Sequence, residues 1–92
     1  MQLFYVKGKK IVKLENNEQI TINYCLVEEQ EVRSKPLYGI KLIQENGSGP
    51  IVSEYTEPLS YSKAYVENIL EKLIENNVFI SNFIETVDDL VV

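Results

Sequence analysis

Ser60 and Lys63 come nearest to a catalytic motif in the types and the spacing of their side chains. In the S-x-x-K pattern of penicillin-recognising enzymes, a nucleophilic serine lies at the start of a helix and the lysine follows one turn later. The S-D-N and K-T-G partners of that motif are absent, and the chain is far too short for that fold. A serine in such a place also accepts a hydrogen bond from an unpaired backbone N–H. We therefore interpret Ser60 or Ser62 as a helix cap rather than a nucleophile.

Other residues that could do chemistry have no suitable partners. The sequence contains no histidine, which removes histidine-based acid–base catalysis, serine–histidine and cysteine–histidine pairs, and most zinc sites. Cys25 is the single cysteine, so it cannot form an internal disulfide, and we expect a half-exposed, inert thiol in a strand. The glycines around Ser48 precede a strand rather than a helix, unlike a phosphate-binding loop. We expect no catalytic residue, metal ion or cofactor.

Two clusters of carboxylates could hold a hard cation or divide acid and base roles. Neither cluster has the loop spacing of an EF-hand, so we interpret both as solvated surface. They comprise Glu28, Glu29 and Glu31, and separately Glu85, Asp88 and Asp89.

The last third of the chain, from residue 60 to residue 92, predicts two amphipathic helices joined by a tight corner. Its apolar residues recur at helical spacing and form one stripe on each helix. The first helix should end at Asn76-Asn77, because asparagine tolerates the left-handed conformation. Ser81 or Asn82 should cap the second, with Glu85 completing a capping box. The stripes comprise Val66, Ile69, Leu70, Leu73 and Ile74, then Phe83, Ile84, Val87, Leu90 and Val91.

Residues 1–57 predict four or five short strands. We expect strands over 3–14, 19–29, 37–44 and 51–56, with Gly8 marking either a turn or a bulge within the first. One face of the sheet should contact the helices, and an apolar patch of Val27, Leu37 and Ile43 should lie on the other. The chain is therefore expected to be one α+β domain over residues 1–92: an antiparallel meander followed by two C-terminal helices on one sheet face. The helix-facing residues would include Ile20, Ile22, Tyr24, Leu26, Ile40 and Leu42.

Charge and hydropathy limit the partners and the cellular compartment that we expect for this protein. The net charge is −5, yet residues 1–14 carry four lysines and no acidic residue. A net acidic chain binds nucleic acid poorly, because contacts to phosphate dominate that affinity. No apolar run approaches the roughly 18 residues of a membrane span. With a single cysteine and no signal-peptide pattern, we expect a cytoplasmic protein with neither a nucleic-acid nor a membrane partner.

A resemblance to a known family follows from three short motifs. Tyr38-Gly39-Ile40, the Ser60-x-x-Lys63-x-x-Val66 helix start and Glu75-Asn76-x-Val78 resemble a family of small, acidic, uncharacterised proteins from clostridial-type bacteria. The resemblance covers about residues 37–91. It implies a domain of unknown function, and it supplies no activity.

The leading hypothesis is a non-enzymatic interaction or regulatory module that forms a homodimer through an open sheet face or an edge strand. The patch of Val27, Leu37 and Ile43 would be part of the contact. The lysine-rich first hairpin would either protect an edge or meet the acidic helices of a second copy. The alternative is a small-molecule-binding domain, because Tyr55, Tyr61 and Tyr65 could cluster near the start of the first helix. An enzyme ranks third.

Overall fold

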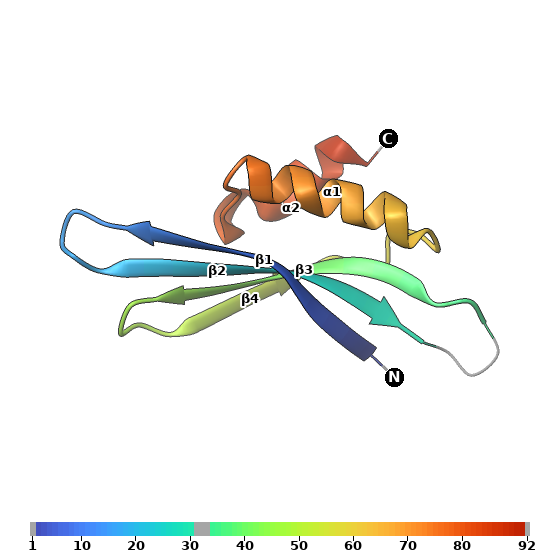
Figure 1. Ribbon diagram of the computed structural model, residues 1–92, viewed down its shortest axis with the longest axis horizontal. Coiled ribbons are helices and arrows are strands. Elements are labelled where there is room, and N and C mark those ends of the chain that lie inside the picture. The colour runs from blue at the N-terminus through green and yellow to red at the C-terminus, as the bar shows by residue number, and fades with distance from the viewer. Residues whose placement is uncertain (1, 31–33, 92) are drawn as a thin grey trace.

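A four-stranded antiparallel sheet and two helices make up the fold. The computed structural model describes residues 2–30 and 34–91. The sheet order is β1-β2-β3-β4, which is a simple meander. Figure 1 shows both helices on the same side of a twisted sheet, which confirms the predicted α+β architecture. The elements are β1 (Gln2–Lys13), β2 (Gln19–Glu29), β3 (Leu37–Asn46), β4 (Ile51–Tyr55), α1 (Lys63–Glu75) and α2 (Ile80–Leu90).

Gly8 marks a bulge within one long strand, not a turn between two. The pairing of β1 with β2 shifts register between Val6 and Gly8, and the strand continues to Lys13. A side chain at Gly8 would place its Cβ 2.5 Å from Cδ1 of Ile74 on α1, so glycine allows the helix to approach the strand. Next to it, Nζ of Lys7 lies 3.4 Å from the carboxylate of Glu67, which ties β1 to α1.

The core lies between the sheet and the two helices. Tyr24 at its centre is fully buried, and its hydroxyl donates a 2.8 Å hydrogen bond to the Val78 carbonyl in the corner between the helices. Burial raises the pKa of that hydroxyl. Of the expected helix-facing residues, five are buried and Ile20 is partly buried against them. The buried residues of this core are Ile22, Tyr24, Leu26, Tyr38, Ile40, Leu42, Val66, Ile69, Leu70, Leu73, Val78, Phe83 and Val87.

The first helix begins and ends close to the predicted residues. Ser62 is its N-cap, and its Oγ accepts a 3.2 Å hydrogen bond from the Tyr65 N–H. Ser60 instead accepts a hydrogen bond from the Ser62 N–H and bridges to β3 at Tyr38. Asn76 is the C-cap and Asn77 has a φ of 51°, which confirms the expected stop.

The predicted cap of the second helix was wrong. The helix starts at Ile80, with Phe79 in the N-cap position, so neither Ser81 nor Asn82 is the cap and Glu85 completes no capping box. Asn82 acts from within the first turn, where its Oδ1 accepts a 3.1 Å hydrogen bond from the Phe79 N–H. The error arose because an apolar residue occupies the cap position while a polar side chain three residues later reaches back to it.

Candidate interaction surface

The face of the sheet away from the helices, here called the open face, is built by alternate residues of all four strands. The strand pairing defines rows that run across it from β1 to β4. One row consists of Val6, Cys25, Lys41 and Tyr55. Two residues further along β3, toward the β3–β4 turn, the next row consists of Lys9, Asn23, Ile43 and Ser53. Beyond it lies a row of Ile11, Thr21, Glu45 and Ile51.

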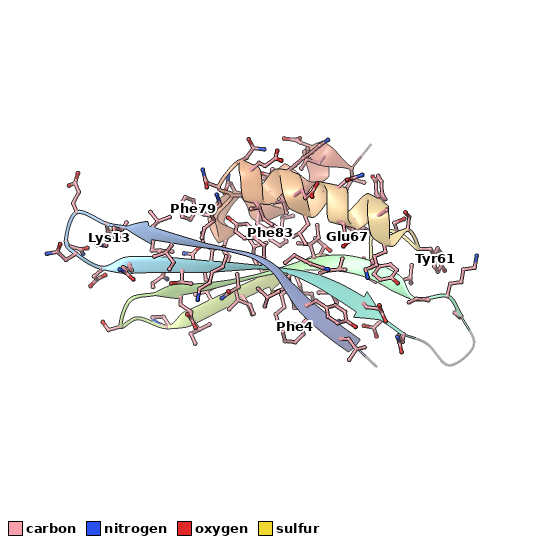
Figure 2. The ribbon with its side chains drawn as sticks, viewed as in Figure 1. Phe4, Lys13, Tyr61, Glu67, Phe79 and Phe83 are labelled. Carbon is pink, nitrogen blue, oxygen red and sulfur yellow. The ribbon has the colours of Figure 1, made fainter. Side chains whose placement is uncertain are left out.

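Large apolar side chains lie exposed on both edge strands of this face. They are Phe4 (51% exposed), Val6 (58%) and Ile11 (58%) on β1, and Ile51 (65%) and Tyr55 (67%) on β4. In Figure 2, Phe4 lies on the side of the sheet opposite Phe83, which belongs to α2 and is buried in the core. The open face therefore carries exposed apolar side chains along both of its edges, with the helix layer behind it.

Lys41 lies across the middle of the open face. It extends from β3, and its Nζ lies 4.8 Å from the centre of the Phe4 ring on β1, in the range of a cation–π contact. Because β2 runs between those strands, the two side chains meet across β2, on which Cys25 is the pairing partner of Lys41. Aliphatic stems of lysine commonly cover apolar surface in this way while the charge stays in water.

The expectation of a half-exposed Cys25 was wrong, because the thiol is fully buried. The cysteine lies on β2 between Val6 of β1 and Lys41 of β3, which are its pairing partners. Burial raises the pKa of the Cys25 thiol, and the positive charge of Lys41 opposes that rise in part. Both burial and the raised pKa reduce the fraction of reactive thiolate at neutral pH.

Cys25 should therefore be resistant to thiol reagents in the folded protein. We expect labelling by a small disulfide reagent at pH 8 to be at least about a hundredfold slower in the native protein than in denaturant, since the thiolate is the reactive form and access is blocked. Lys41→Ala shortens the side chain paired with Cys25 on β3 and should raise the native rate. Native labelling as fast as that in denaturant would contradict the burial of this side chain.

A hollow of about 370 Å³ lies at one end of the open face, beyond the end of β4. Val27, Leu37 and Gly39 contribute its apolar part, and Tyr55 and Pro58 also line it. A Cβ on Gly39 would lie 3.0 Å from Oγ1 of Thr56 and 3.4 Å from the Glu57 carbonyl oxygen, so glycine lets this segment pass close to β3. The carboxylate residues Glu29 and Glu57 also line the hollow.

The structure groups the predicted contact residues differently from the sequence. Tyr55 lines the same hollow as Val27 and Leu37, on the open face. Ile43 lies on the same face, two rows further along β3 from Gly39, and is half-buried. Tyr61 instead lines a different hollow, and the two hollows that Tyr55 lines include neither Tyr61 nor Tyr65.

The exposed residues of β1 were missed because the faces of this strand depend on its bulge. Phe4 and Val6 lie on the open face before the bulge, and Lys9 and Ile11 lie on it afterwards. The alternation of apolar residues changes phase at Gly8, which is the one signal that could have placed them.

Ser60 and Lys63 lie at the start of the first helix. Ser60 Oγ accepts a hydrogen bond from a backbone N–H, and Lys63 is exposed at the first turn of α1. Within residues 2–30 and 34–91, no group of three or more histidine, cysteine, aspartate or glutamate side chains could hold a metal ion. Glu31 of the first carboxylate cluster lies outside the described residues. In the same ranges, no helix is long and apolar enough to cross a membrane.

Comparison with known proteins gives a family without an activity. A family model described as a family of unknown function (DUF6514) matches residues 4–92, a longer stretch than the resemblance in the sequence motifs. No curated protein and no solved structure matches the chain.

Proposed function

We propose that this chain, which belongs to the family of unknown function (DUF6514), is a non-enzymatic protein-interaction module that self-associates through its open face. The observation that carries the proposal is the set of exposed apolar side chains on both edge strands of that face, from Phe4 on β1 to Tyr55 on β4. Several exposed apolar side chains on one face of a small domain favour a contact site, because leaving them in water is unfavourable. A cytoplasmic location is part of the proposal, and the single, unpaired cysteine supports it.

The area of the open face suits a modest homodimer. With strands about 4.8 Å apart and a rise of about 3.3 Å per residue, the four strands present a face of roughly 600 Å². Two copies stacked face to face would bury about 1,200 Å² in total, at the lower end of stable interfaces. A weak to moderate dimer is therefore the expected result.

The edges of the sheet are less suited to self-association. The outer strand β1 carries Lys7, Lys9, Lys10 and Lys13 and no acidic residue, so pairing two copies of it would bring like charges together. Lysines on an edge strand commonly block such pairing. The opposite edge, β4, is only five residues long. These features favour the face over the edge.

The small-molecule alternative has less support. Tyr55 lines the hollow of the open face, while Tyr61 precedes α1 and lines another hollow. Binding sites for small molecules are concave and bring a few polar groups together around an apolar pocket. The exposed residues of the open face instead form a broad surface, which suits a protein partner better.

Sedimentation of the wild type and two matched variants tests the proposal. At tens of micromolar, the wild type should approach twice the 10.6 kDa mass of one chain. Val6→Lys places a positive charge on the β1 side of the open face, where Lys41 cannot pair with it, and should shift the protein to monomer because the charge would be desolvated in the contact. Ile84→Lys is the control, since Ile84 is also exposed (41%) but lies on α2. A monomeric wild type, or equal effects of the two variants, would refute the proposal.

A further inference from the structure

We propose that two copies stack their open faces about a two-fold axis parallel to the strands, so that the Phe4–Lys41 pair of each copy enters the hollow of the other. The inference rests on the proposed function and specifies its partner, a second copy, and its geometry. It follows from three features of the open face: the rows, the distribution of charge and the shape of the hollow.

Two of the rows have an exposed apolar residue on each edge strand, and a two-fold axis parallel to the strands would bring these residues together. A two-fold axis parallel to the strands sets β1 of one copy over β4 of the other while keeping each residue near its own row. Val6 would then face Tyr55, and Ile11 would face Ile51, because each pair shares a row. All four side chains are at least 58% exposed in the single chain. Aligned packing of this kind is common between two sheets, with a tilt of about 30° from their twist.

Apart from Glu29 at the end of β2, the charges of the open face are divided between its two halves. Lys9 and Lys13 lie on β1, and the Lys41 ammonium group extends to the same half to reach Phe4. Glu45 lies on β3, and Glu57 follows β4 on the other half. The proposed axis brings the basic half of each copy over the acidic half of its partner. Complementary charge of this kind selects the register of a contact.

A two-fold axis that lies in the contact plane but runs perpendicular to the strands would bring like charges together. It would place β1 over β1 and bring the lysines of the two copies together, with no acidic residue on either strand. Like charges brought together in a contact are costly, so this arrangement is disfavoured. The axis parallel to the strands is the one that the charges support.

The hollow is complementary to the Phe4–Lys41 pair in shape and in charge. Phe4 shares its row with Val27 and Gly39, and Glu57 approaches Gly39 at the far end of that row. The proposed axis therefore sets Phe4 of one copy over the hollow of the other. Its ring would meet apolar residues such as Leu37 and Pro58, while the Lys41 ammonium group would meet the Glu57 carboxylate. Both copies make the same contact, as a two-fold axis requires.

A charge exchange between copies tests this pairing. Lys41→Glu and Glu57→Lys should each weaken dimerisation at least about tenfold, because each sets like charges against each other across the contact. An equimolar mixture of the two variants should form dimers with an affinity within about threefold of the wild type, since both opposite-charge pairs are then restored. A chain that carries both substitutions should also dimerise by itself. Sedimentation of each variant, of the mixture and of the double variant gives these affinities, and raising the salt concentration should weaken the wild-type dimer.

Glu54→Lys is the matched control for Glu57→Lys. Glu54 is exposed on β4 but pairs with Leu42 on the helix-facing side of the sheet. Glu54→Lys should dimerise by itself like the wild type, and it should not restore the binding of Lys41→Glu, whose charge still meets Glu57 of the partner copy. A wild-type dimer without rescue in the Glu57→Lys mixture, or with equal rescue by Glu54→Lys, would overturn this pairing and leave self-association intact. A wild type that stays monomeric would refute the proposed function itself.

A second pair of variants covers the case in which Lys41→Glu uncovers Cys25 and unfolds the chain, as circular dichroism would show. Lys41→Met keeps an apolar stem beside the cysteine and removes the charge. Lys41→Met and Glu57→Gln should each weaken the dimer, and the double variant should be no weaker than the weaker of the two. Fully additive losses would show that the two groups do not meet and would overturn the pairing.

Discussion

Replacing Phe83 with alanine is expected to lower the free energy of unfolding by about 3–5 kcal/mol, the range for truncating a buried aromatic side chain. Phe83 is fully buried and is among the largest side chains of the core. It belongs to α2, which contacts β3, β4 and α1. Small domains are stable by roughly 5–15 kcal/mol, so this loss would be a large share of the total.

Chemical denaturation monitored by circular dichroism measures the loss at Phe83. The control is Ile84→Ala, because Ile84 is the next residue of the same helix and is 41% exposed. It should lose less than about 1 kcal/mol, since a surface side chain leaves no cavity. Equal losses at the two positions would mean that the buried face of α2 is assigned wrongly.

Leu73→Ala should lower the free energy of unfolding by about 2–5 kcal/mol, because the lost methyl groups leave a cavity between α1 and the sheet. Leu73 is fully buried in the same core as Tyr24 and Leu42 of the sheet. Ile74 beside it packs over Gly8, so the helix is held against the bulged strand and cannot easily collapse into the cavity.

Leu73→Met is the control for that truncation. It keeps nearly the same volume and should cost less than about 1.5 kcal/mol. Thermal and denaturant unfolding of the two variants give the difference directly. A loss below about 1 kcal/mol for Leu73→Ala would contradict the burial of this position.

Local patterns were enough to predict the elements and the inner face of the sheet. The helical spacing of Val66, Ile69 and Leu73 placed them correctly in the core, and the alternation from Ile20 to Leu26 gave the helix-facing side of β2. Both signals are short-range, because a side chain's direction follows from the period of its own element. The stop at Asn76-Asn77 was predictable for the same reason, since it depends on the backbone preference of one residue type.

The local sequence could not decide between a turn and a bulge at Gly8, because the choice depends on contacts with other parts of the chain. A glycine among lysines is compatible with a turn or with a bulge. The bulge results from the long pairing of β1 with β2 and from the close approach of Ile74, which leaves no room for a side chain there. Because the bulge shifts the phase of the strand, it also determines that Phe4 and Ile11 share the open face.

The candidate contact surface shows most clearly where the sequence was sufficient and where the tertiary structure was needed. The residue pattern by itself determined that one side of the sheet would carry Val27, Leu37 and Ile43 away from the helices. It did not place Tyr55 with the first two, predict the full burial of Cys25 or bring Lys41 to Phe4. Those contacts join residues on different strands that are distant along the chain. Which residues become neighbours depends on the register of the strands, on the twist of the sheet and on the path of the chain after β4. Only the packed sheet determines these three features.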